Sequence, residues 1–278
     1  DLGWMNDTLK YYAMDPAYKP WHHDLITFSM AYFYQEKFIL PFSHDEVVHS
    51  KGTIVDKMWG NYETKFSLAR NLSTYMFTHP GKKLNFMGNE LAMFREFDEK
   101  KEMDWFMLKY PIHSSFNRYF RDLSLIYKSH KAFNSSDYNN KYGFKWIDAD
   151  NNTQSIFIYS RYDDENYFLI VLNMTPVSYQ NYSVGVPFKG KYFEMITSAK
   201  DIYNGCNMCN FKPVFTHKKK IHGYDNCINI DVAPYAAIIF RKDISKVKPT
   251  DDINNLVLLN QNKQTKVIRA KEGKEDGR

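Results

Sequence analysis

Apolar side chains recur at helical spacing in several segments of the first 130 residues. Four of them fall at positions i, i+4, i+7 and i+8 and so mark one face of a helix: Leu68, Leu72, Tyr75 and Met76. The sequence His79-Pro80-Gly81 should end this helix. Leu25, Phe28 and Tyr32 show similar spacing earlier in the chain. A further helix is predicted from about Pro111.

Short apolar runs lie between these helices and predict buried strands. Phe38-Ile39-Leu40 is one such run and breaks at Pro41, while residues 84–88 form another, which ends at Asn89-Glu90. Strands that alternate with helices form parallel sheets, because each helix crosses over between two neighbouring strands. About three strand positions are present, which is too few to close an eight-stranded barrel. The pattern therefore predicts a piece of such a barrel.

The hydrophobic pattern changes after about Tyr142. Seven short apolar segments follow without helices between them: residues 142–147, 155–162, 167–174, 181–187, 191–198, 227–232 and 236–242. Short strands separated by turn-forming residues predict an antiparallel β-sandwich. Residues 168–172 are apolar on both faces and should be central in a sheet. The basic run His217-Lys218-Lys219-Lys220 is expected in a solvated loop.

The predicted organisation has three parts. Residues 1–134 form the partial barrel, residues 135–242 form the sandwich, and residues 243–278 form a polar tail that is expected to be disordered. No stretch approaches the roughly 20 apolar residues that span a membrane. Asp1-Leu2-Gly3-Trp4 has neither an initiator Met nor a basic region, so a signal peptide is not expected and the chain resembles the middle of a longer protein.

The amino-acid composition limits the kinds of binding partner and the cellular compartment that are expected. The net charge of +5 comes from acids and bases mixed along the chain, which argues against nucleic acid as a partner. The 21 Tyr and 21 Phe suit a carbohydrate-handling protein, although filling of the two cores explains them more simply. Three cysteines are too few and too scattered for a disulfide framework, and fit a reducing cytoplasm.

The spacing of Cys206 and Cys209 matches half of a zinc site. Cys227, His217 and His222 are candidates to complete it, but no second pair of cysteines is present. Three unrelated thiols are the favoured interpretation, so no metal is expected.

Polar residues whose side chains can take part in catalysis directly follow the first apolar run. The segment Leu40-Pro41-Phe42-Ser43-His44-Asp45-Glu46-Val47-Val48-His49 resembles the bacterial glycogen branching enzymes of the α-amylase superfamily. Residues 3–8, residues 82–90 and Asp104-Trp105 fit the same family pattern, and the resemblance covers roughly residues 1–242. It implies the C-terminal third of a (β/α)8 TIM barrel followed by an antiparallel β-sandwich, with no cofactor.

The resemblance also implies the chemistry. Such enzymes cleave an α-1,4 link with retention, using a carboxylate nucleophile and a carboxylic acid about 5–5.5 Å apart, and pass the chain to the 6-hydroxyl of an acceptor glucan. A third carboxylate binds sugar hydroxyls and favours the oxocarbenium-like transition state. By its place in the motif, Asp45 is that third acid, and His44 is its neighbour at the substrate.

Other polar residues have less definite expectations. Glu46 and His49 either support the loop or bind sugar. Glu90, at the end of the second predicted strand, either faces the site or anchors a loop. Arg95 and Trp105 are candidate glucan contacts.

The beginning of the chain resembles the end of barrel strand six, so Trp4 and Asp7 are candidates to line the cleft. In the family, the nucleophile follows strand four and the acid follows strand five, so the resemblance implies that both precede Asp1. The isolated chain is then expected to be inactive and to fold poorly. Its expected partners are α-glucan and the missing N-terminal part of the same enzyme.

Three alternatives remain open. Another hydrolase or debranching enzyme of the superfamily shares Ser43-His44-Asp45 but passes the intermediate to water. A non-catalytic glucan-binding remnant would keep the sandwich without the chemistry. The chain is also open to interpretation as a truncated or split gene product.

Overall fold

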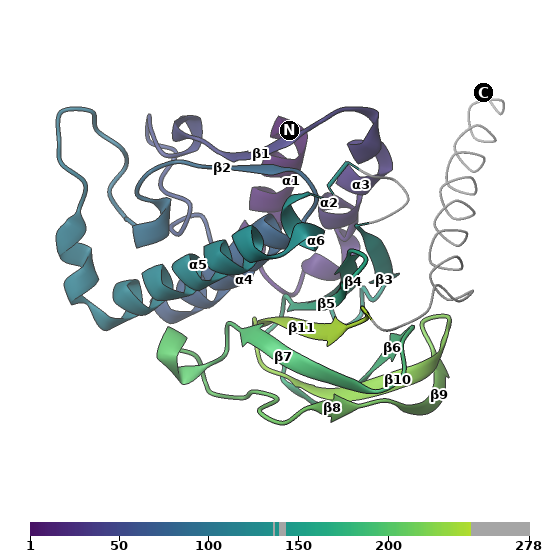
Figure 1. The fold of residues 1–278 in the computed structure, drawn as a ribbon. Helices are drawn as coiled ribbons and strands as arrows, with labels where there is room; N and C mark the ends of the chain where they lie inside the picture. The colour runs from purple at the N-terminus through teal and green to yellow at the C-terminus, as the bar shows by residue number, and fades with distance from the viewer. Residues whose placement is uncertain (136, 139–142, 246–278) are drawn as a thin grey trace.

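The computed structural model describes residues 1–135, 137–138 and 143–245 and shows a helical layer packed on two stacked sheets (Figure 1). The helical layer contains two strands among its helices: α1 (Leu2–Ala13), α2 (Asp24–Thr27), α3 (Ser29–Tyr32), β1 (Ile39–Phe42), α4 (Tyr62–Thr78), β2 (Lys82–Asn85), α5 (Pro111–Ser129) and α6 (Lys131–Asn134). The tail that was expected to be disordered lies outside the described residues from 246 onward.

The sheets contain the nine remaining strands of the described chain: β3 (Lys145–Asp148), β4 (Ile156–Tyr162), β5 (Asn166–Asn173), β6 (Tyr179–Val186), β7 (Lys191–Thr197), β8 (Val214–Phe215), β9 (His217–Ile221), β10 (Tyr224–Val232) and β11 (Ala237–Asp243). Six strands form one sheet in the order β3-β4-β5-β11-β7-β8, and three form the other in the order β6-β10-β9. Each pairing in these sheets is antiparallel, which confirms the predicted architecture.

All seven strands predicted for this region are present, and β5 lies between β4 and β11 with every residue buried. The prediction for the basic run was wrong. His217 to Lys220 lie in β9, an edge strand whose partner is β10. Its lysines are exposed to solvent, so the strand lacks the alternation of apolar and polar residues that predicts a strand. Lysine at an open sheet edge also discourages pairing with other chains.

β1 and β2 form a parallel pair in the register Ile39 to Lys82 through Phe42 to Asn85, with α4 as the crossover between them. The parallel arrangement was predicted. The strand does not stop at Pro41, however, because Pro41 pairs with Leu84 inside it. Proline is compatible with this position because β1 has a strand neighbour on one side only within the described chain.

β2 differs from the prediction. It begins two residues earlier than expected, and its side chains are not buried, since Leu84 is 41% exposed. Ile39 of β1 is also half exposed, whereas Leu40 and Phe42 are buried. A two-stranded sheet with helices packed on one face leaves the other face open, and apolar content alone does not reveal this.

One hydrophobic core joins the helical layer to the six-stranded sheet. Alternate residues of β4 and β5, such as Phe157, Tyr159 and Phe168, pack toward the helices, while Ile158 and Leu169 pack toward β6 and β10. This alternation follows from the two-residue period of a strand. The six-stranded sheet is therefore the middle layer, which explains why β5 is apolar on both faces.

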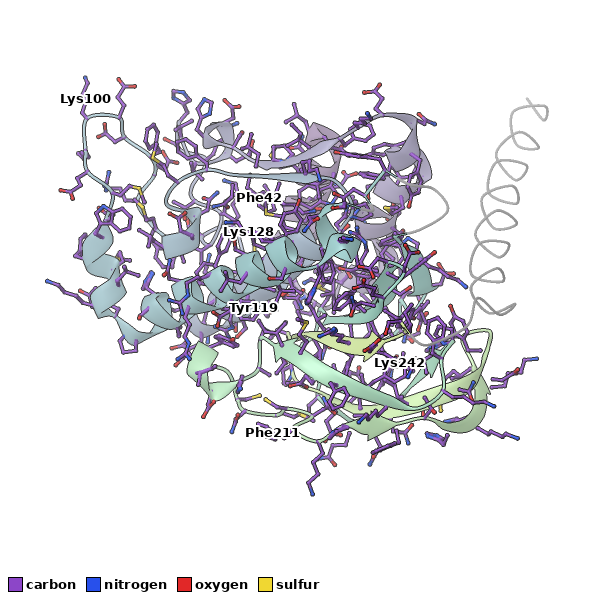
Figure 2. All side chains as sticks on the ribbon, in the orientation of Figure 1. Phe42, Lys100, Tyr119, Lys128, Phe211 and Lys242 are labelled. Carbon is purple, nitrogen blue, oxygen red and sulfur yellow. The ribbon has the colours of Figure 1, made fainter. Side chains whose placement is uncertain are left out.

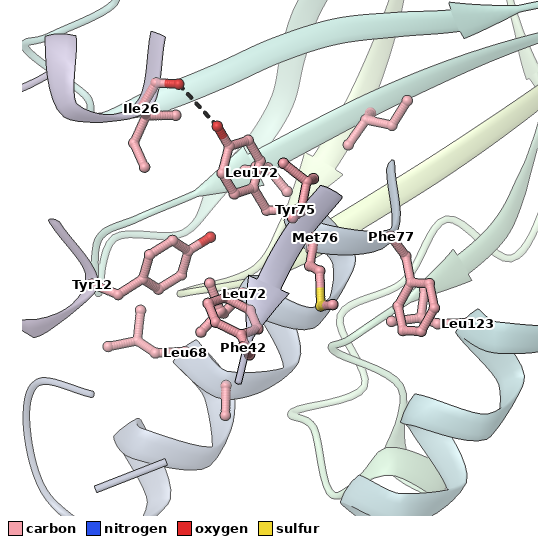
Figure 3. Packing of buried hydrophobic residues seen from close by; sticks show 14 of the residues in the cluster. Tyr12, Ile26, Phe42, Leu68, Leu72, Tyr75, Met76, Phe77, Leu123 and Leu172 are labelled. Atoms are coloured by element: carbon pink, nitrogen blue, oxygen red, sulfur yellow. Dashed lines mark hydrogen bonds between the residues drawn. The ribbon is translucent and has the colours of Figure 1, made fainter. Parts of the chain in front are cut away.

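Within the helical layer, α4 presents its predicted apolar face to the core. Leu68 and Leu72 lie near Phe42 of β1, as Figure 3 shows. The hydroxyl of Tyr75 donates a hydrogen bond of 2.9 Å to the carbonyl of Ile26, which links α4 to α2. β1 is thus held firmly at its inner face, and the polar segment that follows it has a fixed starting point.

Candidate active site

The His44-Asp45-Glu46 segment forms a short 3-10 turn directly after the carboxyl end of β1. The side chains of His44 and Asp45 are 58% and 66% exposed. Ser43 donates a hydrogen bond of 3.3 Å from Oγ to Oδ2 of Asp45, and Nε2 of His44 lies 3.4 Å from Oδ1. The contacts are long, so the carboxylate keeps capacity for further hydrogen bonds.

The end of β2 meets the end of β1 at this point. The backbone N–H of Phe86 donates to the carbonyl of Phe42 at 2.9 Å, and Nδ2 of Asn89 donates to the same carbonyl at 3.2 Å. The ring of Phe86 lies 5.7 Å from that of His44, centre to centre. The two strand ends therefore form one edge, which is where parallel sheets place their functional side chains.

Glu46 holds the loop that follows. Its carboxylate is 15% exposed and pairs with Lys51 at 3.2 Å, and its backbone carbonyl accepts from Nζ of Lys57. His49 is exposed and has a φ of 59°, in the left-handed region. The structure thus gives Glu46 a loop-supporting contact and leaves His49 open to solvent.

Glu96 completes this loop, and sequence analysis did not find it. Its two carboxylate oxygens accept hydrogen bonds from the backbone N–H groups of Gly52 at 2.6 Å and Ser50 at 3.0 Å. These bonds lower the pKa of Glu96 below its ordinary value. The contacts cross more than 40 positions of sequence, so no local signal could have identified them.

Glu90 anchors the turn after β2. Oε2 accepts from the backbone N–H of Gly88 at 3.0 Å, where a φ of 97° suits glycine, and the Glu90 carbonyl accepts from Nδ2 of Asn117 at 3.1 Å. Of the two roles expected for Glu90, these contacts correspond to loop anchoring.

Arg95 is engaged by a carboxylate of its own loop. It donates two bonds from Nε and one from Nη2 to Asp104, at 2.7–3.2 Å, and a further bond from Nη2 to the carbonyl of Glu102 at 2.7 Å. Asp104 raises the pKa of Arg95. Trp105 follows at the start of a 3-10 helix (Trp105–Lys109) and is 52% exposed.

A cavity of about 330 Å³ lies beside the Asp45 loop. The long segment between β2 and α5, with Lys100 at its tip in Figure 2, forms most of the wall. Its lining includes Val47, Thr53, Asn89, Arg95 and Met103, but not Asp45 or Trp105. The backbone N–H of Phe97 donates to the carbonyl of Val47 at 2.9 Å and ties this segment to the Asp45 loop.

Trp4 does not line a cleft, contrary to expectation. Residues 2–13 form helix α1, which Asp1 caps by accepting from the N–H of Trp4 at 2.8 Å. Trp4 is 1% exposed and its ring centre lies 5.4 Å from Phe42 and 5.8 Å from Tyr75. Burial in the core explains an aromatic residue here. Asp7, on the same helix, is partly exposed.

The three thiols are all free, and Sγ of Cys227 lies 3.0 Å from Nε2 of His217. Across the described ranges, no group of three or more His, Cys, Asp or Glu side chains is arranged to hold a metal ion. In the same part of the chain, none of the helices combines the length and apolar character needed to cross a membrane.

Comparison with known proteins identifies relatives of the chain. Residues 146–243 match the model of the alpha amylase C-terminal all-beta domain. The chain is 42% identical over 256 residues to the 1,4-alpha-glucan branching enzyme GlgB 1 of Clostridium perfringens (strain SM101), covering 91% of this chain and 38% of that protein. The chain is a homologue of the 1,4-alpha-glucan branching enzymes. The branching enzyme GlgB of Nitrosococcus oceani is 43% identical over 241 residues, or 87% of this chain and 32% of that protein.

This homologue of the branching enzymes thus spans well under half the length of either relative. Two solved structures share its fold. The AmyP structure determined in complex with maltose has a TM-score of 0.59 and 10% identity, and covers 86% of this chain and 48% of that one. The alpha-amylase from H. orenii has a TM-score of 0.51 and 13% identity, with 86% and 47% covered. At these identities the likeness concerns the fold alone.

Proposed function

We propose that this chain supplies one part of the active site of a 1,4-α-glucan branching enzyme. That enzyme would cleave α-1,4 links and transfer the released chain to a 6-hydroxyl, forming α-1,6 branches in glycogen. The observation that carries the proposal is the exposed carboxylate of Asp45 at the joined carboxyl ends of β1 and β2. The relatedness to branching enzymes over 91% of the chain supports it.

Asp45 would act as the transition-state stabiliser. Its carboxylate is open to solvent on a turn that Ser43 and His44 orient, so a sugar hydroxyl can reach it. Hydrogen bonds from sugar hydroxyls to a carboxylate strengthen as positive charge develops on the ring, and so favour the transition state over the ground state. His44 would contribute a second polar contact to the same sugar.

The remaining predicted residues divide by their contacts. Glu46 and Glu90 would position the loops that carry the site, because their carboxylates are already paired within those loops. Arg95 would brace the cavity wall through Asp104. His49 and Trp105 are exposed and remain proposed glucan contacts.

We further propose that residues 1–134 belong to the last part of a (β/α)8 barrel and that residues 135–242 are its C-terminal sandwich. The parallel pair β1–β2 with its crossover helix supports the first assignment. The nucleophile and the general acid would come from an N-terminal part of the same enzyme, with α-glucan as the substrate, in the cytoplasm and without a cofactor. The isolated chain should then show no branching activity on amylose.

The test is the substitution Asp45→Asn in the complete enzyme. It keeps the shape of the side chain and removes its charge, so we expect the rate of α-1,6 linkage formation to fall about 1,000-fold. Asp164→Asn, in an exposed turn of the sandwich, is the matched control and should leave the rate unchanged. A loss of less than tenfold for Asp45→Asn would refute the assignment. Product linkage analysis separates branching from hydrolysis or debranching, since only branching makes new α-1,6 links.

A further inference from the structure

Two neighbouring aromatic rings stand out from the surface next to a 3-10 turn, η1 (Lys19–Trp21). Trp21 is 72% exposed and Tyr18 is 61% exposed. Their ring centres lie 6.4 Å apart and their planes are tilted by 46°. Isolated exposed apolar residues are common, but a tryptophan this open beside a second ring forms a contiguous apolar surface.

The turn is fastened to the sheet from below by Lys19, which lies between the two rings in sequence. Lys19 is fully buried, and its Nζ donates to the carbonyl of Met174 at 3.3 Å. The same nitrogen lies 5.1 Å from the ring centre of Tyr11 and 5.8 Å from that of Tyr12. Burying a lysine is costly, and the hydrogen bond and the two ring contacts offset part of that cost.

A second anchor follows two residues after Trp21. Nδ1 of His23 lies 3.2 Å from the carbonyl of Ala149, and its ring stacks on Phe157 at 4.3 Å. Inside the turn, the N–H of Trp21 donates to the carbonyl of Tyr18 at 3.3 Å, and Pro20 restricts the backbone further. The backbone that carries the two rings is therefore held on both sides, so little of its conformational freedom remains to be lost on binding.

We propose that Tyr18 and Trp21 form a platform that binds an α-1,4-linked glucan. The choice of ligand rests on the proposed function. The apolar C–H faces of glucose pack on aromatic rings, and two rings tilted by 46° suit a chain that turns from one sugar to the next, as α-1,4 links make it do. A β-1,4-linked glucan is a flat ribbon and would need nearly coplanar rings. The exposed carboxylate of Asp24, just beyond the turn, can accept hydrogen bonds from sugar hydroxyls.

The experiment measures binding of maltoheptaose and glycogen to the whole chain by affinity electrophoresis and calorimetry. Trp21→Ala should weaken binding about tenfold, which corresponds to the loss of one aromatic stacking contact. Trp21→Phe keeps a ring and should restore most of the affinity. Phe211→Ala is the matched control, because Phe211 is 69% exposed and lies on the sandwich side of the molecule (Figure 2). Cellohexaose, with β-1,4 links, should bind more weakly than maltoheptaose.

Each outcome bears on the proposal. If Trp21→Ala binds as well as the unchanged chain, the platform is refuted while glucan binding by other residues stands. If the unchanged chain binds neither glycogen nor maltoheptaose, the platform is refuted outright. Equal binding of cellohexaose would overturn the preference for α-links. The role of Asp45 is tested by branching activity and not by this binding, so failure of the platform is distinguishable from failure of the proposed function. Unchanged urea unfolding of Trp21→Ala would show that the variant is folded.

Discussion

The buried arginine of β4 gives the sharpest stability prediction. Arg161 has no exposed surface, and its guanidinium donates to Oδ1 of Asp137 at 2.8 Å and to three backbone carbonyls. The acceptors belong to separate segments: Thr78 at the end of α4, Ala132 in α6, and Gly143 before β3. This one side chain therefore joins the helical layer to the middle sheet.

Arg161→Met removes all of these bonds and leaves the buried Asp137 carboxylate with an ion pair to Lys82, at 3.5 Å. Breaking a buried ion pair from one side costs about 3–5 kcal/mol, because the other charge is left uncompensated. The three orphaned carbonyls add to this cost. We expect the free energy of unfolding to fall by about 4 kcal/mol, a large share of the roughly 5–15 kcal/mol of a typical domain.

The assay is urea unfolding followed by circular dichroism, with the slope checked for two-state behaviour. The control is Arg121→Met, since Arg121 is 67% exposed and pairs with Asp122 at 3.7 Å, so its loss should cost less than about 1 kcal/mol. In the double variant Arg161→Met/Asp137→Leu, the uncompensated charge is gone, so the cost should be smaller than the sum of the two single changes by about 1–3 kcal/mol. A cost below about 1 kcal/mol for Arg161→Met, or strict additivity in the double variant, would refute this account.

Two further predictions use pKa shifts. Burial lowers the pKa of Lys19 from 10.5 to about 7. Between these two pH values the unfolded state binds more protons than the folded state. Lys19 therefore makes the free energy of unfolding rise with pH by up to about 1.4 kcal/mol per pH unit. Urea unfolding at pH 7 and pH 9 should show a shallower rise in Lys19→Met than in the unchanged chain. The pKa of Glu96 is lowered below its ordinary value of 4.5 in the folded state. The ionised carboxylate therefore adds to the free energy of unfolding above pH 4.5, and this contribution is lost as the pH falls through the folded-state pKa. Glu96→Gln should speed hydrogen exchange at Ser50 and Gly52 at neutral pH, while Glu99→Gln should not; equal exchange in both variants would contradict the clamp.

Sequence patterns predicted the structure correctly where it depended on the side-chain pattern or the local order of the elements. The apolar face of α4 and the seven sandwich strands follow from side-chain periodicity, and the parallel pairing of β1 with β2 follows from strand–helix alternation. The position of Asp45 directly after β1 followed from the same local order. Trp4 and β2 were placed wrongly because burial depends on what packs against a segment, and periodicity does not contain that information.

The sequence by itself therefore determined the order of helices and strands, the all-β second half and the segment that carries Asp45, because these depend on residues near one another in the chain. The tertiary structure alone decided that Glu96 clamps Ser50 and Gly52, that the side chain of Lys19 is buried against Met174, and that Arg161 joins two layers. The bonds of Glu96, of Lys19 and of Arg161 to Thr78 link residues 44 to 155 positions apart, and long-range packing selects them by bringing a charged side chain to its partner. Local propensity gives no indication of them.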